Sequence, residues 1–482
     1  MGFLSSSLDN IISSAAYLSS EFVLGGLVLF LLLLSIIADT NKYKWVFIGC
    51  TLLSLILSLV YVLDQKEVID QNLFLGLLNI NHYVLFFKVL ILLSGSLTTL
   101  LFIKDKAPFD AEPLIFMVAI MLGLNILISS ADLLMTYVSI ELVSLTSYAM
   151  VYRSTSKSAE AALKYLLFGA VASAIMLYGM SLIYGVAHSF DYETLSQAFE
   201  SVSHANYHIL ILAIITIMLG FLFKIGSFPM HLWIPDVYES ASTPVVAFYS
   251  TAPKIGGTLA LVNLCNQLGW IGMDVLAVFA IITILFGNFP ALWQSNLKRL
   301  MGYSSIAHAG IILMALVAFD SNHFESLKLF LFIYVFMNFS AFLLIQVCET
   351  NGEATFENIK GLGKQSTIVG VVAIVIAMSL TGLPPTGGFM AKFLVFSGFW
   401  NMANTLNQPL FWVVLSVALV NTVIALFYYI KIPYYMYFKT SEKNSEFNVS
   451  DGHKIFLALS LILLVGSFIK IDWLLELISI FN

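Results

Sequence analysis

The sequence predicts an all-α polytopic membrane protein with about fourteen transmembrane helices. Of the 482 residues, 60% are hydrophobic and only 10% are charged, whereas soluble domains typically carry about 25% charged residues. The mean hydropathy is +0.93. The apolar residues form continuous runs that can cross a hydrocarbon layer of about 30 Å, and they do not alternate as in a membrane β-barrel.

The apolar runs give the expected spans in chain order, since a membrane-crossing helix needs roughly 17–25 residues. They lie near 21–37, 45–63, 83–103, 113–130, 132–152, 161–187, 208–228, 245–267, 271–293, 303–319, 327–348, 368–400, 410–432 and 454–471. No hydrophilic segment is long enough for a separate domain, so residues 1–482 are expected to form one membrane domain.

Positive charge gathers in the loops that follow odd-numbered spans, whereas Lys66 is nearly alone in the other loops. The charged loop residues include Lys42, Lys44, Lys104, Lys106, Arg153, Lys157, Lys298, Arg299, Lys360, Lys364, Lys431, Lys439, Lys443 and Lys454. The positive-inside rule therefore predicts that these loops face the cytoplasm and that both termini lie outside. The first twenty residues contain no Lys or Arg, so no cleaved signal peptide is expected.

Composition also excludes several classes of function. The net charge of −6 gives no basic surface for a nucleic-acid partner. The three cysteines are far apart and form no Cys/His cluster, so we expect no zinc, haem or iron–sulfur site and no other metal on this chain.

A few charged residues lie inside the spans, where each costs roughly 2.5–3.5 kcal/mol on insertion scales. They are Lys88, Glu141, Lys224, Lys254 and Lys392. Structural ion pairs are the simplest explanation, but the lysines outnumber the carboxylates, which favours a chain of protonatable sites. Lys164 and Lys328 lie near helix ends, where we expect them to extend towards the interface.

Two of these lysines lie beside interrupted helices. The sequence around Lys224 is GFLFKIGSFPMHLWIPDVYESASTPVVAF, and that around Lys392 is SLTGLPPTGGFMAKFLVF. Proline breaks a helix, and in lipid a break survives only inside protein or beside a water-filled cavity. His231 and His308 lie near these segments, and for each a proton relay and a hydrogen-bonded structural histidine are about equally expected.

The interrupted spans are the seventh and the twelfth, five spans apart, which predicts two inverted five-helix repeats. We expect the repeats at 111–269 (helices 4–8) and 270–432 (helices 9–13), after helices 1–3 at 1–110 and before a loop and helix 14 at 433–482.

Several motifs occur in order along about three-quarters of the chain. They are YVSIELVSLTSY, AALKYLLFGAVAS, FKIGSFPMHLWIPDVYESASTPV, STAPKIGG, NLKRLMGYSSIAHAG and LPPTGGFMAKF. In these motifs, the chain resembles the antiporter-like membrane subunits of respiratory complex I, the proton-pumping NADH–quinone oxidoreductase. Lys392 stands where subunit M of that family typically has glutamate. The long lateral helix of subunit L does not follow the last span.

The resemblance implies proton translocation through Glu141 and Lys224 as a coupled pair, Lys254 as a connecting lysine and Lys392 as the terminal one. It also matches Lys164 to another lysine of the family and His308 to a histidine of the family. It also implies a bacterial inner membrane, partners such as subunit M and the small subunit K, and no cofactor on this chain. FMN, iron–sulfur clusters, NADH and quinone would belong to partner subunits. The alternatives are a multisubunit cation/proton antiporter without redox partners and a purely structural membrane subunit.

Overall fold

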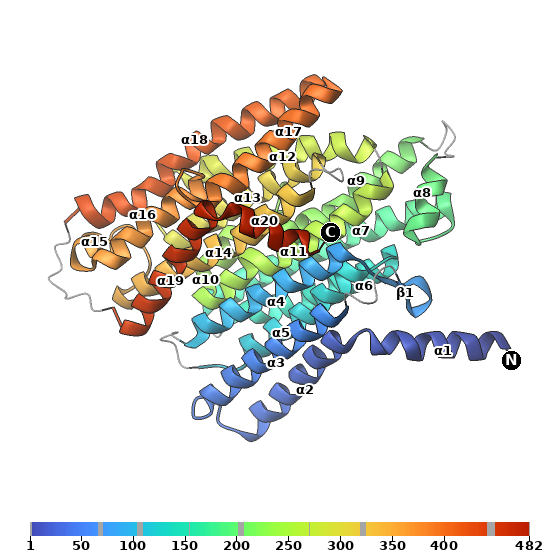
Figure 1. Cartoon of the computed structure of the whole chain (residues 1–482), viewed down its shortest axis with the longest axis horizontal. Coiled ribbons are helices and arrows are strands. Elements are labelled where there is room, and N and C mark those ends of the chain that lie inside the picture. Colours follow the sequence, from blue (N-terminus) through green and yellow to red (C-terminus); the bar gives the residue numbers. More distant parts are fainter. Residues whose placement is uncertain are drawn as a thin grey trace.

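Long apolar helices make up most of the chain in the computed structural model (Figure 1). The structure describes residues 2–65, 71–103, 109–153, 155–200, 207–268, 270–318, 324–440 and 449–481. Within these ranges, 13 helices are long and apolar enough to cross a membrane. Lys66, Lys104, Lys106 and Lys443, which contribute to the predicted charge asymmetry, lie outside the described residues.

The two predicted interruptions are present. The seventh span runs as α9 (Tyr207–Ile225) and continues, after a turn, as the short α10 (Trp233–Ser240). The twelfth divides into α16 (Thr367–Thr381) and α17 (Gly387–Leu406). Because α16 has only 15 residues, the twelfth span is not among the 13 helices counted above. Adding it gives the predicted number of spans.

The remaining membrane-crossing helices follow the predicted apolar runs closely, and shorter elements connect or flank them. The helices are α1 (Gly2–Ala16), α2 (Ser19–Ile37), α3 (Lys44–Asp64), α4 (His82–Ile103), α5 (Glu112–Ser129), α6 (Leu133–Val151), α7 (Ser156–Ala187), α8 (Tyr192–Glu200), α11 (Thr243–Leu268), α12 (Trp270–Ala291), α13 (Leu297–Val317), α14 (Phe324–Cys348), α15 (Leu362–Gln365), α18 (Pro409–Phe438), α19 (Asp451–Ile469) and α20 (Ile471–Ser479). A small antiparallel hairpin, β1 (Gln71–Leu73) and β2 (Leu78–Ile80), joins α3 to α4. The sequence patterns predicted neither this hairpin nor the short helices α1, α8 and α20.

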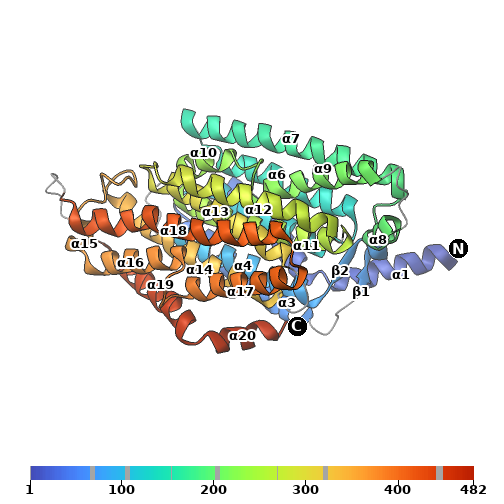
Figure 2. The same cartoon turned by 90° about the horizontal axis from the view of Figure 1, so that it is seen from above.

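The most buried helices lie in the middle of the bundle. Helices α11, α13 and α14 are almost wholly covered by protein, whereas α2, α3, α18 and α19 leave most of their surface open. Figure 1 places α2 and α3 at one edge of the bundle and α18 at the opposite edge. Figure 2 shows α7 along one face and α20 along the other. The central helices carry Lys254 and His308, so these side chains are shielded from lipid.

Two further lysines are buried and have partners that the sequence did not indicate. The prediction that Lys328 extends to the interface is wrong, because its side chain is fully buried and donates to the Phe481 carbonyl at 3.1 Å, just after α20. Lys88 forms an ion pair with Glu21 of α2 at 2.7 Å, and both side chains are buried. The simpler explanation, a structural ion pair, therefore holds for Lys88.

Candidate functional site

The first helix interruption ends α9 with a glycine that no other residue could easily replace. Gly226 has a φ of +76°, and a Cβ there would lie 2.2 Å from Ile234 Cδ1. The backbone N–H groups of Gly226 and Ser227 both donate to the Leu222 carbonyl at 2.9 Å. This cap ends the helix at Gly226. The carbonyls that follow Leu222, including that of Ile225, then have no backbone N–H partner within the helix.

Lys254 binds one of the freed carbonyls. Its ammonium group, on α11, donates to the Ile225 carbonyl at 2.7 Å and to the Ser305 carbonyl of α13 at 2.7 Å. The side chain is only 2% exposed. The carbonyl end of a helix carries a partial negative charge that stabilises a cation. Lys254 therefore joins the broken helix to α13 inside the protein.

The second interruption repeats this arrangement with a different lysine. Gly382 ends α16 with a φ of +90°, and the N–H groups of Gly382 and Leu383 donate to the Met378 carbonyl at 2.8 Å. Lys392 Nζ, on α17, donates to the Leu380 carbonyl at 2.8 Å and to the Thr381 carbonyl at 2.9 Å. Each broken helix thus ends at a buried ammonium group.

Lys224 and Glu141 are close enough to interact electrostatically, but each bonds to a different serine. Lys224 Nζ donates to Ser144 Oγ of α6 at 2.6 Å. Glu141, also on α6, accepts a hydrogen bond from Ser173 Oγ of α7. In the described part of the chain no ion pair joins the two charges, although the field of Glu141 reaches Lys224. The two residues of the predicted pair are therefore not in direct contact in this conformation.

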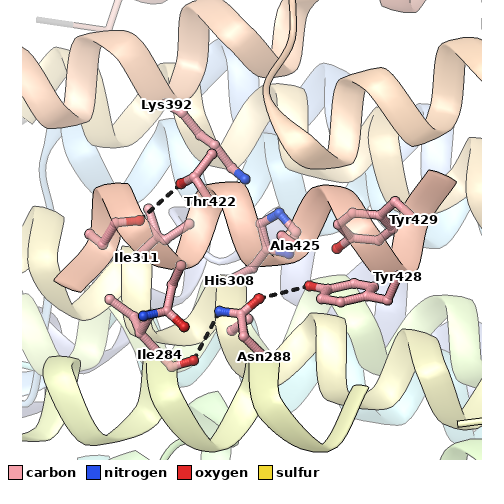
Figure 3. Close-up of a pocket in the computed structure, with 12 residues that line it drawn as sticks. Ile284, Asn288, His308, Ile311, Lys392, Thr422, Ala425, Tyr428 and Tyr429 are labelled. Atoms are coloured by element: carbon pink, nitrogen blue, oxygen red, sulfur yellow. Dashed lines mark hydrogen bonds between the residues drawn. The ribbon is translucent and has the colours of Figure 1, made fainter. Parts of the chain in front are cut away.

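Polar groups of α13 lie between Lys254 and Lys392. Ser305, whose carbonyl accepts from Lys254, exchanges a hydroxyl hydrogen bond with Tyr238 at 3.0 Å. One turn along, His308 Nδ1 hydrogen-bonds to the Ser304 carbonyl at 2.9 Å. His308 and Lys392 line one small cavity (Figure 3). Polar groups of α13 therefore connect Lys254 to the cavity beside Lys392, and Lys224 lies next to Ile225, whose carbonyl binds Lys254.

The other two candidate relays have partners outside this row. His231 is buried in the turn between α9 and α10, where its ring contacts Phe228 and Phe286. Lys164 is 43% exposed and forms ion pairs with Glu160 at 2.8 Å and Asp236 at 2.9 Å. Of the seven predicted positions, the structure brings together Glu141, Lys224, Lys254, His308 and Lys392.

A charged network covers the end of α10, on the side that the loop charges predict to be cytoplasmic. Arg299 donates to Asp236 and to Glu239, both at 2.8 Å, and Glu239 also pairs with Lys157 at 2.7 Å. Burial alone would raise the pKa of Asp236 and of Glu239. Hydrogen bonds from the neighbouring cations outweigh burial and hold both pKa values below their ordinary range. The network therefore stays charged at neutral pH.

Sequence reasoning missed the neutral members of the row. They are Ser144, Ser173, Asn288, Ser304, Ser305, Tyr334, Asn421, Tyr428 and Tyr429. Serine and tyrosine are common in membrane helices and give little signal. An asparagine within a long apolar run, such as Asn421 in VVLSVALVNTVIALF, was a usable signal because burying an amide is costly.

Among the described residues, no group of three or more His, Cys, Asp or Glu side chains could hold a metal ion.

Several known proteins are similar to this chain in sequence and in fold. A family model described as NADH:quinone oxidoreductase/Mrp antiporter, TM, matches residues 130–424. The chain is 33% identical over 458 residues to "NADH-quinone oxidoreductase subunit N" of Chlorobium chlorochromatii, covering 90% of this chain and 88% of that protein.

Two solved structures are also similar. A chain of respiratory complex I from Thermus thermophilus with bound aureothin superposes with a TM-score of 0.78 at 27% identity, covering 95% of this chain and 98% of that one. A chain of the membrane-bound sulfane sulfur reductase, an archaeal respiratory membrane complex, gives a TM-score of 0.83 over 97% of this chain and 96% of that one. At 21% identity, this second likeness concerns the fold alone.

Proposed function

The chain belongs to the membrane-spanning family of NADH:quinone oxidoreductase and Mrp antiporter subunits, and we propose that it translocates protons within the membrane arm of an NADH–quinone oxidoreductase. The observation that carries this proposal is the row of three buried lysines, Lys224, Lys254 and Lys392, across the centre of the bundle. Two of them bind the carbonyl ends of broken helices. Such helix ends at mid-membrane are typical of ion pathways in transporters.

The proton enters at Lys224 from the cytoplasmic side. Glu141 attracts positive charge and so controls how tightly Lys224 holds its proton. Because Glu141 and Lys224 bond to separate serines here, a small movement of α6 or α7 would change their separation and with it the attraction. The lysines titrate as a coupled set, so protonation of one alters the proton affinity of the next.

Lys254 passes the proton towards α13. Its contact with the Ser305 carbonyl places it beside the polar residues that lead to His308 and Lys392. Repulsion between neighbouring ammonium groups then favours release from Lys392 to the outer side. Quinone reduction elsewhere in the assembly would drive the cycle by conformational or electrostatic coupling.

The chain is a multi-pass membrane protein of a family found in multisubunit membrane complexes. We propose that it lies in a bacterial inner membrane with both termini outside, as the loop charges suggest. Its neighbours would be other membrane subunits, including an antiporter-like subunit M and small subunits such as K. FMN, iron–sulfur clusters and the NADH and quinone sites would lie on partner subunits.

Gentle extraction from the native membrane followed by mass spectrometry tests the assignment. Flavin-bearing and iron–sulfur-bearing partners with NADH–quinone activity would support it. A set of membrane subunits alone, without redox centres, would contradict it and favour the cation/proton antiporter. In the assembled complex, replacing Lys224 with alanine should impair proton pumping, and unchanged pumping would remove Lys224 from the pathway.

A further inference from the structure

The cavity beside Lys392 is the best-defined unexplained feature of the lysine row. It is lined by residues of α12, α13, α17 and α18. Figure 3 shows Lys392 reaching down towards it from α17, with His308, Asn288 and the tyrosine pair Tyr428 and Tyr429 around it. The space open to the centre of a water-sized sphere is about 10 Å³, close to the room that one water needs.

Two buried polar atoms at this cavity have no hydrogen-bond partner among the residues that the structure describes. They are Nε2 of His308 and Oδ1 of Asn421, and the two side chains are 2% and 3% exposed. Leaving such atoms unsatisfied costs free energy, and ordered water is the usual remedy. The neighbouring Asn288 is a useful contrast. Its amide makes the same bond to the carbonyl one turn earlier, but its Oδ1 accepts from Tyr428 at 2.9 Å.

The hydrogen bonds indicate the chemical role of both atoms. Nδ1 of His308 faces the Ser304 carbonyl, which can only accept, so in the neutral tautomer that donates to it Nε2 is an acceptor. The Leu380 carbonyl, which accepts from Lys392, also lies near the ring but makes no hydrogen bond of normal geometry with Nε2. The Asn421 amide nitrogen donates to the Val417 carbonyl at 2.8 Å, so the atom left over is its oxygen. Both unpaired atoms therefore accept. Lys392 has three N–H groups and uses two of them on carbonyls.

We propose that one water in this cavity accepts from Lys392 and donates to His308 Nε2 and to Asn421 Oδ1, and that Asn421 is the positioning residue for proton transfer between His308 and Lys392. The water then has three partners, the usual number for buried water. This inference rests on the proposed proton pathway and specifies the connection between two of its members.

The transfer balances with no further reactant. Protonated His308 gives the proton on Nε2 to the water, and the water gives one of its own protons to the neutral amine of Lys392. One N–H bond breaks at the ring, one forms at the amine, and the water is restored. Asn421 does not exchange a proton. Asn421 Oδ1 accepts a hydrogen bond from the second O–H of the water. This bond keeps the lone pair of the water aligned with His308 Nε2 and its first O–H aligned with Lys392 Nζ.

The experiment compares three substitutions in the assembled complex in proteoliposomes, measuring NADH-driven proton uptake per complex. Asn421→Leu removes the acceptor at similar size and should slow uptake about three- to tenfold. Asn421→Thr keeps a neutral oxygen acceptor, and its hydroxyl can donate to the Val417 carbonyl as the Asn421 amide does, so it should retain more of the rate than Asn421→Leu. Thr422→Val is the matched control, because Thr422 lines the same cavity while its hydroxyl already donates to the Ala418 carbonyl at 3.0 Å; it should leave uptake unchanged.

A high-resolution cryo-EM map of the unsubstituted complex gives a second readout that does not depend on how the variants assemble. We expect density for one water within hydrogen-bond distance of Lys392 Nζ, His308 Nε2 and Asn421 Oδ1. An empty cavity, or wild-type uptake in Asn421→Leu while Lys392→Met abolishes uptake, would overturn this inference and leave the proposed function standing. Normal uptake in Lys392→Met would instead overturn the proposed function itself.

Discussion

Lys224 and Lys392 both lie beside a broken helix, yet their surroundings differ. The part of the row around Lys224 contains a carboxylate, Glu141, and its helix α9 is followed by α10, whose Asp236 pairs with Arg299. Lys392 is surrounded by carbonyls, hydroxyls and amides, and within the described ranges no carboxylate pairs with it. The ammonium groups of Lys224 and Lys392 therefore have different kinds of partner.

The fifth helix of each predicted repeat shows the same difference. Lys254 in α11 and Asn421 in α18 lie almost equally far from the start of their helices. A charged amine stands at this position in the first repeat and a neutral amide in the second. We infer that proton affinity is adjusted by charge at Lys224, where the proton is taken up, and by neutral hydrogen bonds at Lys392, where it is released.

The largest expected effect is loss of the amine at the uptake end. Lys224→Met should slow proton pumping by roughly a hundredfold or more, because a positioned proton carrier contributes about that much. Pumping and NADH–quinone turnover should be measured together in membrane vesicles. Lys157→Met, a substitution at a 61% exposed lysine, serves as the control and should pump nearly normally. If both variants lost proton pumping equally, the buried position of Lys224 in the row would not explain its effect.

Removing the nearby charge should have a smaller effect. Glu141→Gln keeps an acceptor for Ser173 but loses the field that acts on Lys224. A change of one pKa unit in Lys224 corresponds to about a tenfold change in protonation equilibrium, so we expect pumping to fall by about tenfold. Ser173→Ala, which keeps the charge, should cost less. A loss in Ser173→Ala as large as in Glu141→Gln would indicate that the hydrogen bond, and not the charge, controls Lys224.

The Glu21–Lys88 pair should affect stability and not transport. Removing one partner leaves a buried unpaired charge, so Glu21→Gln or Lys88→Met alone should destabilise the protein by about 3–5 kcal/mol. The double variant should recover most of that loss. Thermal unfolding of the assembled complex measures stability, and vesicle assays measure pumping. A stable single variant that no longer pumps would place Lys88 in the proton pathway.

The smallest effect is expected at the charged network on α10. The lowered pKa values of Asp236 and Glu239 mean that their stabilisation is present above the ordinary carboxylate range and is lost as the pH falls through the folded-state values. Arg299→Gln should move that loss to higher pH and cost about 1 kcal/mol or less at neutral pH, because these side chains are partly exposed. Thermal stability measured from acid to neutral pH checks this; an unchanged profile would contradict the assigned role of Arg299.

The sequence predicted what depends on apolar length and on rare residues. The spans follow from hydropathy, the two interruptions follow from Pro/Gly clusters, and Lys224, Lys254 and Lys392 are conspicuous because charge is costly in lipid. Glu21 escaped notice because it stands at the edge of its span. The burial of Lys328 was not predicted because its partner, the carbonyl of Phe481, is distant in the sequence. The position of Asn421 beside His308 likewise depends on packing between helices, which one sequence does not specify.

The most direct test of the central claim is the number of protons moved per NADH when Lys224, Lys254 and Lys392 are replaced together by methionine. The assembled variant and the unsubstituted complex would be compared in identical proteoliposomes, with assembly checked by subunit composition. If the lysine row carries protons, the ratio should fall, or turnover should stop altogether where coupling is tight. An unchanged ratio at normal turnover would contradict the account and identify the row as structural.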